Sequence, residues 1–207
     1  MTFDFIYLAS QSPRRRQLLD QLGVRHELLL PGPEEDAEAL EALRLNEPPA
    51  TYVKRVTLAK LVAAEARLAQ RGLPSAPILC ADTTVALGRR ILGKPVDAAD
   101  AAAILSALSG HTHRVLTAVA LAWPGQSGST QQAQQVSTST VRFAQLTRAW
   151  IDAYVASGEP MGKAGAYAIQ SRAAAQVEHI TGSYSGIMGL PMHETALLLK
   201  GAGVLRD

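Results

Sequence analysis

Residues 8–16 of the chain read Leu8-Ala9-Ser10-Gln11-Ser12-Pro13-Arg14-Arg15-Arg16. The apolar run at 5–8 that leads into this stretch predicts a short buried strand, and the residues that follow it predict a helix that ends before Gly23. Ser12 is a good N-cap, Pro13 suits the first helical position, and Gly23 suits the position after the last turn. The stretch therefore predicts a strand, a turn and a helix in direct succession.

Three arginines stand in the first turn of this predicted helix, where free backbone N–H groups and the helix dipole already carry positive charge. Cations are disfavoured there, and a broken local rule often marks a functional site. An anion bound at the helix start would resolve the conflict, because amides, dipole and guanidinium groups would all point at it. The alternative is a solvated basic turn at the surface.

The composition favours a globular protein with a sizeable core. The chain has 207 residues, of which 47% are hydrophobic and 18% charged, and its net charge is only +2. This balance gives no overall footprint for nucleic acid or membrane, so any basic site must be local. The single cysteine, Cys80, excludes an internal disulfide and suits a reducing compartment. With no leader and no apolar run of about 18 residues, we expect a cytoplasmic protein with one domain over 1–207.

Helical and strand patterns mix along the chain. Strands are predicted at 26–30, 77–81, 114–122 and 136–143, and helices at 51–70, 97–109, 147–157 and 191–199. Residues 162–170 read as extended, 177–183 as a hairpin, and the polar segment 123–135 as a solvated hairpin tip. This order predicts a mixed α/β (α+β) fold.

Two acidic positions are candidates for chemistry. Asp82 follows a buried apolar run, where a carboxylate is costly unless it is paired or bound to metal; the alternative is a turn residue at a strand end. Glu34 and Glu35 follow the strand at 26–30 and could bind a hard cation, although such a pair is more often solvated surface.

Basic and histidine candidates carry weaker signals. Lys94 ends a Gly-x₄-Gly-Lys spacing, but Pro95 replaces the Ser or Thr of a P-loop, so we reject that motif and keep Lys94 as a phosphate-binding charge or a surface lysine. Lys60 lies in a Leu- and Ala-rich helix, where a lysine usually extends to solvent. His111 and His113 could form a metal pair if a third ligand were near.

Taken together, these pieces resemble the Maf family of nucleoside triphosphate pyrophosphatases, whose older name is septum-formation inhibitor. The matching residues run from 8 to about 195: Ser10-x-Ser12-Pro13-Arg14-Arg15, Glu35, Lys60, Ala81-Asp82-Thr83, Gly93-Lys94-Pro95, Ser109-Gly110-x-Thr112-His113, Lys163-Ala164-Gly165-Ala166-Tyr167-x-Ile169-Gln170 and Gly189-Leu190-Pro191. Each motif alone is weak, but their order and spacing together are specific.

The resemblance implies metal-dependent hydrolysis of a nucleoside triphosphate to the monophosphate and pyrophosphate, with Mg²⁺ or Mn²⁺ as the cation. Asp82 would accept the proton of the attacking water, and Glu35 would be its acidic partner at the metal; motif register chooses Glu35 over Glu34. The implied substrate-binding residues are Ser10, Ser12, Arg14, Arg15, Lys60, Thr83, Lys94, Lys163 and Gln170. The implied fold is ITPase-like, an elongated mixed sheet with flanking helices and two lobes around a central cleft, and such proteins are often homodimers.

Arg14, Thr83 and Gln170 are similar to the set of the branch that acts on dTTP and UTP. The Gln170 amide offers a donor and an acceptor, which match O4 and N3–H of uracil or thymine. Ser171 departs from the glycine usual at its position and could shift the base pocket. Two alternatives stay open: a 7-methyl-GTP pyrophosphatase of the same family, and a non-enzymatic nucleotide-binding regulator of cell division.

Overall fold

A mixed sheet forms the centre of the protein, whose computed structural model describes residues 3–125 and 129–205. Its strands are β1 (Ile6–Leu8), β2 (His26–Leu28), β3 (Ile78–Leu87), β4 (Arg90–Leu92), β5 (Thr112–Pro124), β6 (Thr130–Phe143) and β7 (Val177–Thr181). The strand order is β2-β1-β3-β5-β6-β7, with β4 beside β3. β1 runs parallel to β2 and β3, and the remaining pairs are antiparallel. The predicted mixed α/β fold is therefore confirmed.

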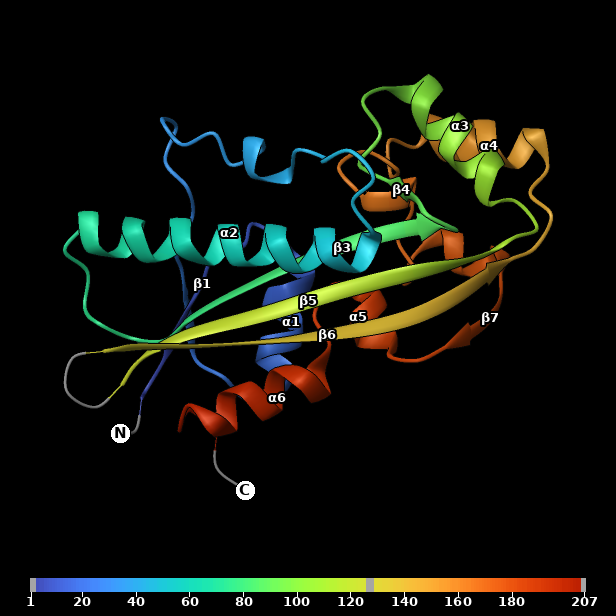
Figure 1. Ribbon diagram of the computed structural model, residues 1–207. Helices are drawn as coiled ribbons and strands as arrows, with labels where there is room; N and C mark the ends of the chain where they lie inside the picture. Colours follow the sequence, from blue (N-terminus) through green and yellow to red (C-terminus); the bar gives the residue numbers. More distant parts are fainter. Residues whose placement is uncertain (1–2, 126–128, 206–207) are drawn as a thin grey trace.

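Helices cover both faces of the sheet. They are α1 (Pro13–Gln21), α2 (Pro49–Gln70), α3 (Ala98–Leu108), α4 (Arg148–Ala156), α5 (Tyr184–Met188) and α6 (Met192–Gly201), with short 3₁₀ turns η1 (Ala39–Glu41), η3 (Ala164–Ala166) and η4 (Arg172–Gln176). Figure 1 shows α2 along one face, α1, α5 and α6 on the other, and α3 beside α4 at one end of the long strands. None of the helices in the described part of the chain is long and apolar enough to span a bilayer.

The core follows the alternation of side chains along β3. Ile78 and Cys80 pack with Leu61 and Ala64 of α2, whereas Leu79 and Ala81 belong to the cluster that α1 and α6 cover. Successive strand residues point to opposite faces, so one strand contributes to both layers of the core. A third cluster, around Phe143 and Tyr154, joins α3 and α4 to the sheet.

One edge of β3 is left unpaired where the site forms. β1 pairs with β3 at Ile78 and Leu79, and β4 pairs with it from Val85 onward. Between these contacts the chain leaves β1 at Ala9 and turns into α1, while β5 stays paired along the other edge of β3. The strand-turn-helix stretch thus ends β1 early and leaves a gap in the sheet beside residues 80–84.

Several expectations from the sequence are corrected. The strand predicted at 77–81 continues to Leu87, so Asp82 lies inside a strand and is no turn residue. Most of the predicted polar tip is strand, with β5 reaching Pro124 and β6 starting at Thr130; residues 126–128 of that tip lie outside the described residues. The hairpin predicted at 177–183 is replaced by β7, which pairs with β6, followed by α5, and the segment 162–170 contains η3.

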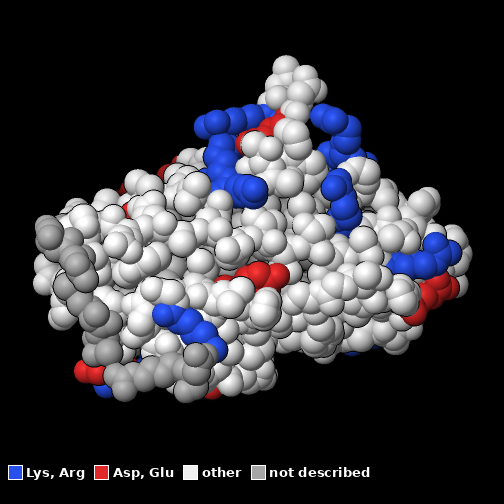
Figure 2. Space-filling model, turned by 60° about the horizontal axis from the view of Figure 1, so that its bottom comes forward, with Lys and Arg blue, Asp and Glu red and all other residues white. Residues whose placement is uncertain are grey.

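Charge is distributed unevenly over the surface, although the net charge is only +2. In Figure 2, Lys and Arg side chains gather in the upper middle of the face toward the viewer, with a few acidic groups among them. Much of the rest of this face carries neither basic nor acidic side chains. A nearly neutral chain can therefore still present a local positive field.

Candidate functional site

A cavity of about 610 Å³ opens at the gap in the sheet, and it collects the predicted site residues. Those that line it are Ser10, Ser12, Arg14, Arg15, Lys60, Asp82, Thr83, Lys94, Lys163 and Gln170. They come from the turn before α1, from α1, α2 and β3, from the residues after β4, and from the loop around η3. Glu35 is not among the lining residues.

Asp82 and Thr83 are neighbours in β3, and the alternation of the strand turns them to different elements. Asp82 is two residues after Cys80 in the strand and therefore points to the same side of the sheet, where it contacts Lys60 of α2 with 2.5 Å between Oδ1 and Nζ. Thr83 points to the same side of the sheet as Ala81, and its hydroxyl lies 3.4 Å from Nη2 of Arg15 of α1. Because the sheet is open beside them, both side chains reach the same cavity.

The arginines of α1 form one wall. Arg15 donates from Nε to the Gly189 carbonyl at 2.7 Å and from Nη1 to the Ser10 hydroxyl at 2.9 Å. Arg14 donates to the carbonyl of Met188 at 3.1 Å. These carbonyls lie at the C-terminal end of α5, so protein groups already compensate for cations at the start of α1. Burial lowers the pKa of both guanidinium groups, but arginine remains cationic in proteins.

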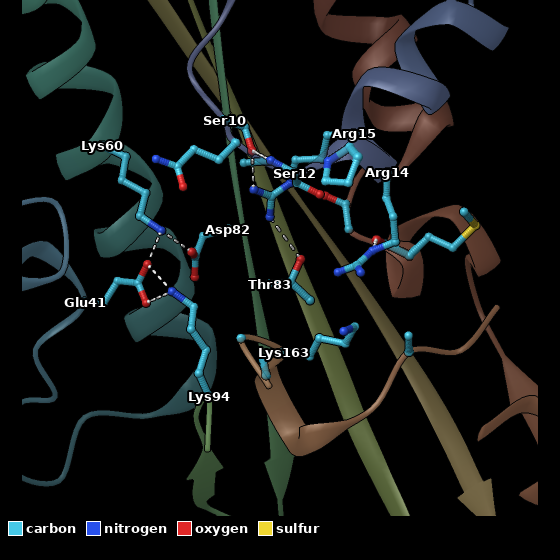
Figure 3. A pocket seen from close by; sticks show the side chains of 18 of the residues that line it. Ser10, Ser12, Arg14, Arg15, Glu41, Lys60, Asp82, Thr83, Lys94 and Lys163 are labelled. Atoms are coloured by element: carbon cyan, nitrogen blue, oxygen red, sulfur yellow. Dashed lines mark hydrogen bonds and ion pairs between the residues drawn. The ribbon is translucent and has the colours of Figure 1, made fainter. Parts of the chain in front are cut away.

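Lysines and carboxylates form the opposite wall (Figure 3). The Lys60 ammonium donates to Asp82 at 2.5 Å and to Glu41 at 2.7 Å, and Lys94 donates to the two oxygens of Glu41 at 3.0 and 2.8 Å. Burial disfavours charge on Lys60, yet the two carboxylates outweigh it and raise its pKa. Burial likewise opposes ionisation of Glu41, but the two ammonium groups lower its pKa. The wall is therefore a charged chain of alternating sign.

Glu41 is a site residue that the sequence reading missed. It ends η1, in a segment that the N-terminal part of α2 holds in place: the Tyr52 hydroxyl donates to the Glu41 carbonyl at 2.8 Å, and Arg55 donates to the Ala42 carbonyl at 2.9 Å. In the sequence, Glu41 is one of several acids between two predicted elements, with no motif to distinguish it. Only the tertiary contact of this segment with α2 brings it to Lys60.

Glu35, predicted as the acidic partner of Asp82 at the metal, lies elsewhere. Arg67 of α2 donates to its carboxylate from Nη2 at 2.5 Å and from Nε at 2.8 Å, and the Gly32 amide donates at 3.0 Å. These hydrogen bonds, with Arg67 first, lower the pKa of Glu35 to about 2. Arg67 itself lines the cavity, so Glu35 lies behind it and fastens its own loop to α2.

The far end of the cavity is formed by residues 163–171, the Gln170 loop, which includes η3 and ends before η4. Lys163 and Gln170 both line it, and the Gln170 side chain is exposed there. Burial, then the charge of Arg14, lowers the pKa of Lys163, and Glu159 partly opposes this. Lys163 also donates to the backbone carbonyl of Glu159.

The histidine and cysteine candidates from the sequence make contacts within the fold and form no metal or catalytic group among the described residues. His113 is buried, its Nε2 lies 2.8 Å from the Tyr167 hydroxyl, and burial lowers its pKa to about 4. His111 contacts the Ser109 carbonyl instead, and no third ligand joins the two histidines within the described residues. Cys80 is fully buried, which raises its pKa to about 12. The hairpin of β3 and β4 carries Lys94, as expected once a P-loop is rejected.

Comparison with known proteins shows the family to which a chain with this site belongs. The family model for Maf-like protein matches residues 5–202. The chain belongs to the Maf family. The dTTP/UTP pyrophosphatase of Albidiferax ferrireducens is 64% identical over 201 residues, which are 97% of this chain and 98% of that protein. The dTTP/UTP pyrophosphatase of Polaromonas sp. is 63% identical, with 97% of each chain covered. A solved HAM1 protein from Coxiella burnetii is more distant, at 16% identity and a TM-score of 0.49 over 95% of this chain and 98% of that one.

The Maf cavity offers few ligands for a cation by itself. No group of three or more His, Cys, Asp or Glu side chains within residues 3–125 and 129–205 could hold a metal. Its carboxylates are Asp82 and Glu41, together with the exposed Glu38. Asp82 uses Oδ1 for Lys60, and its other oxygen accepts no hydrogen bond from the described residues. Mg²⁺ is usually held by one or two carboxylates together with substrate phosphates, and this donor set fits that pattern.

Proposed function

We propose that this protein hydrolyses pyrimidine nucleoside triphosphates, dTTP and UTP, to the nucleoside monophosphate and pyrophosphate. One observation carries the proposal: in a single cavity large enough for a nucleotide, the buried carboxylate of Asp82 lies beside Lys60 on one wall and faces the arginines of α1 on the other. The names of relatives that are 60–64% identical over nearly the whole chain support the same activity.

The walls suit a triphosphate. Arg14 and Arg15 face Lys60 and Lys94 across the cavity, with Lys163 at the side, and together they can neutralise several phosphate charges. The Glu41 carboxylate accepts hydrogen bonds from both Lys60 and Lys94. Phosphate oxygens that approach these two ammonium groups therefore compete with Glu41. Catalysis of phosphoryl transfer rests mainly on such positioning and electrostatics.

Asp82 acts as the general base. A water oxygen attacks the α-phosphorus, its proton passes to the free carboxylate oxygen of Asp82, and the bond from the α-phosphorus to the bridging oxygen of the β-phosphate breaks. Pyrophosphate leaves with that oxygen and with the bonding electron pair. Lys60 holds the other oxygen of Asp82 and so orients the base, while the cations of both walls stabilise the charge that gathers on the leaving group.

Mg²⁺ or Mn²⁺ fits the donor set described above. We assign Asp82 as its protein ligand, with Glu41 as the second carboxylate in place of Glu35, which Arg67 holds. A cation on Asp82 would share the oxygen that accepts from Lys60, which leaves the other oxygen to accept the proton of the water. When bound with substrate, the cation would draw charge from the phosphate oxygens.

The loop that bears Gln170 reads the base. The Gln170 amide presents one donor group and one acceptor, which complement O4 and N3–H of uracil or thymine. Thr83 and Arg14 line the same cavity. Cytosine presents the reversed donor and acceptor pattern, so discrimination against it requires that the Gln170 amide be held in one orientation.

The test is a nucleotide panel with product analysis. UTP and dTTP should yield pyrophosphate, with CTP, GTP and 7-methyl-GTP much slower. Asp82→Asn should lower kcat by about 10³-fold without changing the circular dichroism spectrum, as expected for loss of a general base. Asp152→Asn is the matched control, because Asp152 pairs with Arg148 on the exposed side of α4.

Three results would count against the proposal. Release of orthophosphate in place of pyrophosphate would reject the reaction. Preference for 7-methyl-GTP would assign the other branch of the family. Tight nucleotide binding with no turnover of any substrate would favour the non-enzymatic regulator.

A further inference from the structure

We propose that Ser171, Glu159 and Tyr154 form a brace that holds the Gln170 loop in the shape needed to select the base; this rests on the proposed function. None of the three side chains lines the cavity. They are therefore positioning residues, which act on the nucleotide through Gln170.

The brace is a set of hydrogen bonds between the end of α4 and the loop. The Tyr154 hydroxyl donates to the Glu159 carboxylate at 2.7 Å and lies 3.4 Å from the Ala168 amide, which donates to it. The Ser171 hydroxyl is in hydrogen-bonding contact with the same Glu159 oxygen, and it lies 3.0 Å from the Ala168 carbonyl. Since a hydroxyl has one proton, the bond to the charged carboxylate is the stronger of the two.

These contacts flank Gln170 on both sides. Ala168 precedes it by two residues and Ser171 follows it directly, so the backbone that carries the amide is fixed at both ends. Tyr154 is almost fully buried, and burial together with Glu159 raises its pKa, so its hydroxyl stays a donor over the ordinary pH range. The anchor of the brace is therefore part of the rigid core.

The first half of the loop shows why an anchor is needed. Gly165 and Ala166 adopt positive φ values of +71° and +60°, and for alanine this conformation is unfavourable. Such a backbone persists only when its surroundings determine it. Gly165 is held from the other side, because its amide donates to the Gly93 carbonyl at 3.0 Å and Val85 packs against it. A loop with this strain would relax if its second half were released.

Release of the loop should harm recognition of the base more than hydrolysis. Uracil and cytosine differ at the edge that Gln170 would read, and a displaced amide no longer matches uracil better than cytosine. Loss of one well-placed hydrogen bond to the base corresponds to a drop of about tenfold in the ratio of kcat/KM for UTP to that for CTP.

The experiment compares Ser171→Ala with Ser171→Thr, which keeps the hydroxyl at a position whose φ of −125° a β-branched residue tolerates. Ser171→Ala and Glu159→Gln should lower the UTP-to-CTP ratio by about tenfold, and Ser171→Thr should restore it. Ser106→Ala, which removes a hydroxyl bonded within α3, is the matched control and should leave the ratio unchanged. Both substrates are measured on one sample, so partial unfolding cancels from the ratio.

A double-mutant cycle shows whether the effect passes through Gln170. In a Gln170→Ala background, the further change Ser171→Ala should leave the ratio as it is, because the reader of the base is already gone. An unchanged ratio in the single variant, or a further drop in the double variant, overturns the brace. If the wild-type protein hydrolyses no triphosphate at all, the proposed function fails instead, and the two failures are distinct.

Discussion

Lys60 determines how the acidic groups of the site are presented. A lysine in a Leu- and Ala-rich helix is expected to extend its ammonium to solvent. Here its side chain is only 20% exposed, and the ammonium bridges Asp82 and Glu41. Because both carboxylates share one cation, a substrate phosphate or a metal ion must exchange with part of this arrangement on binding.

The assignment of Glu41 as the second metal carboxylate leads to a direct comparison. Glu41→Gln should raise the Mg²⁺ or Mn²⁺ concentration for half-maximal activity by at least about tenfold, as is common when a group around a metal is lost. Glu35→Gln should change it less than about twofold, because Arg67 holds that carboxylate outside the cavity lining. Mn²⁺ binding measured by electron paramagnetic resonance, with a non-hydrolysable nucleotide present, provides a second readout. A larger increase in the required metal concentration for Glu35→Gln than for Glu41→Gln would assign Glu35 as the second metal ligand.

His113 makes stability depend on pH. Burial lowers its pKa from 6.5 to about 4 in the folded state. The unfolded chain therefore takes up a proton first, and the stability contributed by neutral His113 is complete above pH 6.5 and is lost as pH falls toward 4. Between pH 7 and pH 4.5 the loss from this group is about 2–3 kcal/mol. Urea unfolding of His113→Phe should show a pH dependence smaller by about that amount, whatever its absolute stability; an equal dependence in both proteins would contradict the assignment.

At the scale of elements, the short helix α5 supports the arginine wall. The carbonyl of Gly189 at its C-terminal end accepts from Arg15, and Gly189 has a φ of +118°, which favours glycine. A Cβ at this position would meet Thr83 and Arg15 only at ordinary contact distances, so backbone strain dominates the cost of a side chain.

We therefore expect Gly189→Ala to lower the free energy of unfolding by about 1–3 kcal/mol and to raise the KM for UTP as Arg15 loses its support. Gly201→Ala is the matched control, since Gly201 ends helix α6 without a positive φ and a Cβ added there would meet no atom within 4 Å. That substitution should be neutral or slightly stabilising. Thermal unfolding measures the loss of stability, and steady-state kinetics measure the change in KM. A Gly189→Ala protein with unchanged stability would refute the strain argument.

The elements of the site could be predicted to different extents from sequence. The strand-turn-helix around Pro13 was predictable because Pro13 and Gly23 are local signals of where a helix starts and ends, although the Ser12 side chain makes no capping hydrogen bond. The strand that holds Asp82 was predicted too short, because a carboxylate inside an apolar run resembles the end of a strand until Lys60 is seen to pair with it. Helix α5, five residues long, has too few turns to show a period.

At the scale of the whole molecule, the gap in the sheet unites residues that are distant in sequence. The arginines, lysines, Asp82 and Gln170 that the resemblance singled out all line one cavity, because motif order reflects a common fold. It could not indicate that Glu35 is held by Arg67 or that Glu41 enters the cavity, since both outcomes depend on how the segment between β2 and α2 packs on α2. Ionic contacts between elements carry no periodic signal in the sequence.

The central claim is that two walls of the cavity grip one polyphosphate from opposite sides. Its most direct test is the affinity for a UTP analogue with a methylene bridge between the α- and β-phosphates, measured by calorimetry with Mg²⁺. Arg14→Ala and Lys94→Ala, one from each wall, should each weaken binding by about 10- to 100-fold, as expected for loss of a charge-assisted hydrogen bond. Arg142→Ala, taken from an exposed pair with Glu178, should bind like the wild type. Wild-type affinity in either wall variant would show that the nucleotide is held from one side only and would contradict the account.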